Sequence, residues 1–138
     1  MVNVQGYEVP EGLYYSKEWM WTKVEGGKVR VGITDYAQKQ LNEVVFAELP
    51  KAGDEAIRGE PFGTVESVKS VSDLVAPVSG KIVEVNAKVG SNPEVLNEDP
   101  YSEGWIITMS PTNLADDLKT LMNHEQSAEW HKKLAEES

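Results

Sequence analysis

Lys69 is the residue of this chain that is best placed to carry covalent chemistry. It lies in the short polar bridge Val68-Lys69-Ser70, between the apolar-rich runs 62–66 and 74–78. Two β-prone runs joined by a short connection predict a hairpin. The tip lacks the Asn-Gly or Asp-Gly pair typical of a structural hairpin turn. We therefore interpret the tip as presenting a lysine, whose amine can be acylated to a stable amide on a long flexible stem.

The sequence contains no recognisable catalytic constellation. With 0 cysteines it can form no disulfide and supply no catalytic thiol, so any dithiol must arrive on a cofactor. His124 and His131 lack the accompanying ligands typical of a zinc site, so we expect surface histidines and no metal. No phosphate-binding glycine loop, Gly-x-Ser-x-Gly elbow or paired carboxylate frame is recognisable. We therefore expect a protein without catalytic activity of its own.

The composition excludes several classes of partner. A formal net charge of −10 disfavours nucleic acid, because phosphate binding needs a basic face. An acidic surface suits basic docking sites on partner proteins, and it serves solubility equally well. No apolar run approaches the roughly 20 residues of a membrane span, and the N-terminal residues show no signal-peptide pattern. We expect a cytoplasmic monomer that binds neither membrane nor nucleic acid.

The hydrophobic pattern predicts mainly strands. Residues 19–25 and 28–33 alternate on either side of Gly26-Gly27, which is typical of a hairpin, and Trp19 and Trp21 are expected to pack on the sheet. Glycine and proline residues predict an irregular opening segment at 1–12 and a loop at 51–59. Further strands are predicted at 44–49, 81–86 and 105–109.

Capping residues predict a few helices. Thr34 is a candidate cap for a helix over 35–41, and Asn113 for one over 114–122. Asn123 with Gln126 resembles a capping box for a last helix ending at Glu136. The long segment 87–104 is predicted as a loop with a helical piece near 94–97.

Together these elements predict one domain over residues 1–138. The fold class is mainly β, a flattened antiparallel β-sandwich or barrel-sandwich hybrid with a short helix. Its core should occupy about residues 12–110, and a C-terminal helical segment should follow at 113–136.

Three blocks of sequence carry a family resemblance. One contains Glu66-Ser67-Val68-Lys69-Ser70, Ser72-Asp73-Leu74 and Ala76-Pro77-Val78-Ser79-Gly80. The others are Val31-Gly32-Ile33-Thr34-Asp35-Tyr36-Ala37-Gln38 and Asn97-Glu98-Asp99-Pro100-Tyr101, with Gly104-Trp105. In this order they resemble the glycine cleavage system H-protein family, over roughly residues 12 to 122. The resemblance is consistent with the lipoyl-domain-like fold class given above.

The resemblance implies a cofactor and an enzyme that attaches it. Lys69 would carry lipoic acid in amide linkage, added by a lipoylating enzyme. Glu66 and Asp73 flank the lysine, three residues before it and four after it. Solvated turn carboxylates are the simpler interpretation, but the matched block favours enzyme recognition for Glu66. The remaining hairpin residues assigned to recognition are Ser67, Val68 and Ser70.

The resemblance also implies a function and partners. The oxidised lipoyl arm would accept an aminomethyl group from glycine decarboxylase and present it to the aminomethyltransferase. Dihydrolipoamide dehydrogenase would then reoxidise the arm. A carrier of this kind has no active site of its own.

The first strand departs from the family pattern. Where the family usually has His-Glu-Trp, this chain has Trp19-Met20-Trp21. We predict that Trp19 and Met20 border the space into which the arm folds back, an apolar wall unsuited to a buried ammonium. This leaves open an H-like lipoate-binding protein that carries sulfur intermediates for a heterodisulfide-reductase-like complex. A biotin carrier is disfavoured, because biotinyl sites usually place Met on both sides of the lysine.

Overall fold

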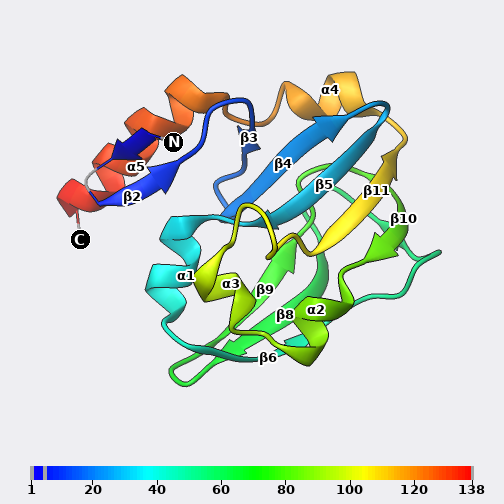
Figure 1. Cartoon of the computed structure of the whole chain (residues 1–138). Coiled ribbons are helices and arrows are strands. Elements are labelled where there is room, and N and C mark those ends of the chain that lie inside the picture. The colour runs from blue at the N-terminus through cyan, green and yellow to red at the C-terminus, as the bar shows by residue number, and fades with distance from the viewer. Residues whose placement is uncertain (1, 5, 138) are drawn as a thin grey trace.

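A six-stranded and a three-stranded antiparallel sheet, a separate two-stranded hairpin at the N-terminus and several helices make up the described part of the molecule (Figure 1). The computed structural model describes residues 2–4 and 6–137. Side chains from both sheets and from helix α1 (Asp35–Leu41) share one core cluster, which includes Val31, Leu74 and Ile107. The sheets stay open rather than closing into a barrel. The predicted mainly β, antiparallel fold class is therefore confirmed.

The larger sheet has six strands and contains the predicted first hairpin. Strands β4 (Met20–Glu25) and β5 (Lys28–Ile33) pair in register from Met20↔Ile33 to Glu25↔Lys28. Gly32 is required here, because a Cβ at this position would lie 2.7 Å from the Trp21 ring. In spatial order the strands are β3 (Tyr14–Tyr15), β4 (Met20–Glu25), β5 (Lys28–Ile33), β11 (Ile107–Pro111), β10 (Gly80–Val85) and β7 (Glu55–Ala56).

The smaller sheet consists of β6 (Val44–Glu48), β8 (Pro61–Ser67) and β9 (Val71–Val75). Its inward positions Ala47, Val65 and Leu74 are buried in the shared core. Its outward positions Glu66, Val71 and Asp73 are exposed. This alternation is the period of two expected for a half-buried sheet. The hairpin formed by β8 and β9 is the one predicted around Lys69.

Local capping signals account for the helices that were predicted correctly. Thr34 Oγ accepts a hydrogen bond from Ala37 N at 3.2 Å at the start of α1. Asn123 and Gln126 form the expected reciprocal capping box, at 2.9 Å in both directions, before α5 (His124–Glu137). Helix α3 (Val95–Glu98) lies close to the predicted position. No helix among the described residues is long and apolar enough to cross a membrane.

Four expectations were wrong. The opening segment forms a hairpin of β1 (Val2–Val4) and β2 (Tyr7–Val9), and the loop at 51–59 contributes the two-residue strand β7. The segment predicted as a loop begins with α2 (Ala87–Ser91), capped by the Asn86 side chain. Helix α4 (Leu114–Leu118) is shorter than expected, and the Asn113 side chain makes no capping hydrogen bond.

His131 is also not the surface histidine that we predicted. Its side chain is 0% exposed, because α5 folds back over the N-terminal hairpin (Figure 1). The ring contacts Tyr15 and Tyr36 edge-on, with centroids 6.4 and 5.8 Å away. A second core cluster beside it contains Val9, Leu13, Tyr15 and Trp21.

Candidate functional site

Lys69 lies in the three-residue connection between β8 and β9, at the free end of the hairpin (Figure 1). Its side chain is exposed, as are those of its neighbours Val68 and Ser70. The strands on either side pair with each other, and β8 also pairs with β6, so the connection extends from a sheet rather than from a mobile loop. The arrangement holds the backbone of Lys69 in place and leaves the amine free to move.

The tip contains no glycine, and the Ser67 side chain stabilises its turn instead. Ser67 is buried, and its Oγ accepts hydrogen bonds from Lys69 N at 3.2 Å and from Ser70 N at 3.0 Å. Ser67 N donates to Ser70 O at 2.8 Å. Serine hydroxyls commonly replace backbone partners in tight turns. Ser67 therefore shapes the tip from below, and little of it is open to an enzyme.

A neighbouring turn anchors the tip. Val68 N donates to the carbonyl of Glu43 at 3.1 Å, and Glu43 belongs to the turn between α1 and β6. The side chain of Asn97 holds that turn on both sides. Its Nδ2 donates to Asn42 O at 2.6 Å, and its Oδ1 accepts from Val44 N at 2.9 Å. Asn97 thus supports the tip indirectly, because it fixes the two residues that flank Glu43, and Glu43 bonds to Val68. The sequence around Asn97 did not indicate this role.

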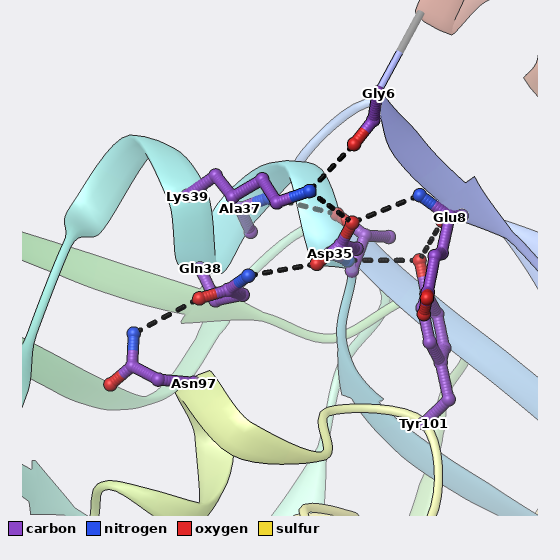
Figure 2. A network of polar contacts seen from close by, with 9 residues as sticks. Gly6, Glu8, Asp35, Ala37, Gln38, Lys39, Asn97 and Tyr101 are labelled. Carbon is purple, nitrogen blue, oxygen red and sulfur yellow. Dashed lines mark hydrogen bonds and ion pairs between the residues drawn. The ribbon is translucent and has the colours of Figure 1, made fainter. Parts of the chain in front are cut away.

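The hydrogen bonds continue from Asn97 to a buried carboxylate (Figure 2). Asn97 Nδ2 lies 3.1 Å from Gln38 Oε1, and Gln38 Nε2 donates to Asp35 Oδ1 at 2.8 Å. Asp35 Oδ2 in turn accepts from Glu8 N at 2.9 Å and pairs with Lys39 Nζ at 3.1 Å. A continuous polar chain therefore links the N-terminal hairpin to the turn beneath Lys69.

Tyr101 closes this network on the side of the N-terminal hairpin (Figure 2). Its hydroxyl donates to Glu8 O at 2.7 Å and accepts from Asp35 N at 2.9 Å. Burial raises the pKa of Tyr101 above its ordinary value, which already lies well above neutral pH, and the protonated hydroxyl serves as a donor. The resemblance block around Tyr101 therefore has a structural function in this chain.

Glu66 and Asp73 lie on the same outward face of the smaller sheet. Glu66 pairs with Val71, and Asp73 pairs with Thr64, two positions further along each strand. Both carboxylates are exposed. The structure thus brings the two flanking acids to one side of Lys69, and it puts Ser67 on the opposite, inward side.

Trp19 and Met20 lie at the start of the first predicted hairpin, in the other sheet. Met20 is 1% exposed and belongs to the main core. Trp19 is partly buried, has a φ of 74° and contacts the Tyr36 ring edge-on at 5.7 Å between centroids. Met20 thus offers almost no surface to a folded-back arm. That these two residues border the arm stays a prediction.

An acidic hollow lies beside the anchor of the tip. Its volume is about 360 Å³, and it is lined by Glu43, Glu94, Asn97 and Glu98. Among the described residues, no group of three or more His, Asp or Glu side chains is arranged to hold a metal ion. The chemistry within reach of the site is therefore that of an exposed amine surrounded by carboxylates.

Comparison with known proteins decides the family. The sequence profile of the family described as "Glycine cleavage H-protein" matches residues 13–134. This chain belongs to the glycine cleavage H-protein family. The protein named "Probable glycine cleavage system H protein" in Pyrococcus abyssi is 51% identical over 135 residues, which cover 97% of this chain and 100% of that protein. The "Glycine cleavage system H protein" of Halalkalibacterium halodurans is 53% identical over 121 residues, 88% of this chain and 94% of that protein.

A solved H-protein structure has the same fold. The crystal structure of a glycine cleavage system H protein from Mycobacterium marinum superposes with a TM-score of 0.81 at 36% sequence identity. The match covers 89% of this chain and 98% of that one. As an H-protein, the chain is a lipoyl carrier of the glycine cleavage type. The sulfur-carrier alternative finds no support, because these relatives are named for glycine cleavage.

Proposed function

We propose that Lys69 is the lipoylated residue of this H-protein. Three observations support it: the exposure of Lys69, its place in a connection held by two strands, and the Ser67 and Glu43 contacts that fix the backbone around it. These features fit a long arm that must swing while its base stays still. The proposal rests most heavily on one observation: the Lys69 side chain is exposed on a backbone that hydrogen bonds hold in place.

Bound lipoate would supply a ring disulfide that can accept a carbon group and be reoxidised, chemistry that this cysteine-free chain lacks. The chain's own residues would do the rest. Ser67 and Glu43 would keep the base of the arm fixed, and Glu66 and Asp73 would mark the face from which enzymes approach. Glu43, Glu94 and Glu98, which line the hollow beside the tip, would attract a cationic group brought near it.

We further propose the partners and setting of this carrier. It would be lipoylated by a dedicated enzyme and would then serve glycine decarboxylase, the aminomethyltransferase and dihydrolipoamide dehydrogenase in turn. It would have no catalytic activity of its own. It would work as a single-domain monomer in the cytoplasm, as the sequence predicts.

The proposal is tested by lipoylating the chain and mapping the modified peptide. The wild type and a Lys69→Arg variant would be incubated with a lipoylating enzyme, ATP and lipoate. We expect the wild type to gain one lipoyl mass on the peptide containing Lys69. The variant should gain none, because a guanidinium is no acyl acceptor at neutral pH.

Lys81→Arg is the matched control, since Lys81 is also an exposed lysine. It follows the hairpin of β8 and β9 around Lys69, here called the attachment hairpin. The Lys81→Arg variant should be lipoylated like the wild type, and all three proteins should show the same thermal unfolding. Lipoate on any lysine of the Lys69→Arg variant, or an unmodified wild type, would overturn the assignment.

A further inference from the structure

Four exposed apolar side chains gather around the tip of the attachment hairpin. Phe46 is 53% exposed, Val45 49%, Val68 66% and Val71 64%. Register places Phe46 opposite Glu66 and Glu66 opposite Val71, in one row across β6, β8 and β9. Two inter-strand spacings, about 10 Å, separate the ends of this row. We call Val45, Phe46, Val68 and Val71 the tip patch.

None of these four side chains belongs to the hydrophobic core. The inward neighbours Ala47 and Val65 already supply this sheet's contribution to the core. Single exposed apolar residues are common on any protein surface. Here, however, four of the seven large hydrophobic side chains that are exposed in the described part of the chain surround one lysine. Such a concentration indicates a surface that is covered by a partner.

The charges around the tip patch indicate what kind of partner fits. The three strands contain no Lys or Arg, and their charged residues are Glu48, Glu66 and Asp73. All three carboxylates are exposed. The complementary surface is therefore an apolar hollow rimmed by basic side chains, which would pair with the acids while Phe46 is buried.

We propose that the tip patch is the docking surface for the enzyme that acylates Lys69, with Phe46 as its main anchor. The inference rests on the proposed function. In the transfer, Lys69 Nζ loses a proton to solvent and attacks the carbonyl of an activated lipoyl anhydride. The amide C–N bond forms as the bond to the activating group breaks. This enzyme must enclose Nζ itself and hence contact the residues around it, whereas later partners act at the far end of the arm.

Serine substitutions test the docking surface. Phe46→Ser and Val71→Ser remove apolar contact area from positions that point away from the core, so both variants should fold. Ile57→Ser is the matched control, because Ile57 is 57% exposed but lies far from the tip. It belongs to the turn before β8, and Gly59 N of this turn donates to Ala76 O at the end of the hairpin remote from Lys69. Lipoylation rates would be measured over a range of carrier concentrations, with thermal unfolding as a check of folding.

We expect Phe46→Ser to raise the KM for the carrier about tenfold, and Val71→Ser about threefold, with kcat unchanged. Ile57→Ser should match the wild type. Unchanged KM in Phe46→Ser, an equal rise in Ile57→Ser, or a loss confined to kcat would each overturn the docking inference. Failure of the proposed function looks different, because then the wild type itself would take no lipoate on Lys69.

Discussion

His131 is the buried titratable residue that connects α5 to the rest of the molecule. Its Nδ1 lies 2.7 Å from the carbonyl of Ser127, so this nitrogen carries the proton and donates. Its Nε2 is buried and has no hydrogen-bond partner among the described residues. Burial lowers the pKa of His131 below the usual 6.5, and this outweighs the opposing effects of the Ser127 bond and the Asp35 charge. The ring is therefore neutral in the folded chain at neutral pH.

The stability of the protein should accordingly fall in mild acid. The unfolded chain binds a proton at this histidine below pH 6.5, whereas the folded chain does not until a lower pH. The stabilisation is complete above pH 6.5. As the pH falls from 6.5 toward the lower pKa of the folded state, the free energy of unfolding should decrease by up to about 1.4 kcal/mol per pH unit.

Urea unfolding between about pH 5 and pH 7 measures this slope. A His131→Phe variant should lose it whatever its absolute stability. His124→Gln is the control and should retain the slope, because it removes a histidine and leaves the His131 ring in place. A slope that persists in His131→Phe would show that another group is responsible.

At the scale of elements, the turn between α1 and β6 determines how the hairpin of β8 and β9 is held. Asn42 adopts a φ of 65° in this turn, and Asn97 from α3 satisfies the backbone groups on both sides of Glu43. The Glu43 carbonyl then accepts from Val68 beside the lysine. Helix α3 thus positions the tip indirectly, through a turn that is distant from α3 in the sequence.

Removing the Asn97 side chain should loosen the tip in particular. Asn97→Ala leaves Val44 N and Asn42 O without these partners, a loss of about 1–3 kcal/mol. We expect hydrogen exchange at Val68 N to accelerate at least tenfold relative to the core strands. Asn86→Ala is the matched control, because Asn86 bridges two carbonyls at 2.9 and 2.7 Å, those of Glu103 and Trp105. Equal exchange at Val68 in both variants would contradict the positioning role.

The sequence predicted those elements whose causes are local. Alternating residues gave the hairpins, and Thr34 and the Asn123–Gln126 pair correctly marked helix starts. The N-terminal hairpin was missed, because β2 is held by distant groups such as the Asp35 carboxylate and the Tyr101 hydroxyl. Asn86 did carry a local signal for α2, which the surrounding glycine and proline residues obscured.

At the scale of the whole molecule, the exposed position of Lys69 was predicted better than the contacts that hold it. Lys69 is exposed at a hairpin tip as expected, since that prediction needed only the local pattern. The anchor through Asn97 joins residues 53 apart in sequence, and no pattern along the chain indicates it. The sequence likewise predicts Met20 as a strand residue without indicating how deeply it is buried. Its burial follows from the packing of the two sheets.

The central claim, that this chain carries its passenger on Lys69 in glycine cleavage, is tested most directly by glycine–bicarbonate exchange. The assay would combine glycine decarboxylase with either the lipoylated wild type or the Lys69→Arg variant after identical treatment. We predict exchange with the wild type that saturates with carrier concentration, and only the background rate with the variant. Exchange supported by Lys69→Arg, or no exchange with fully lipoylated wild type, would contradict this account.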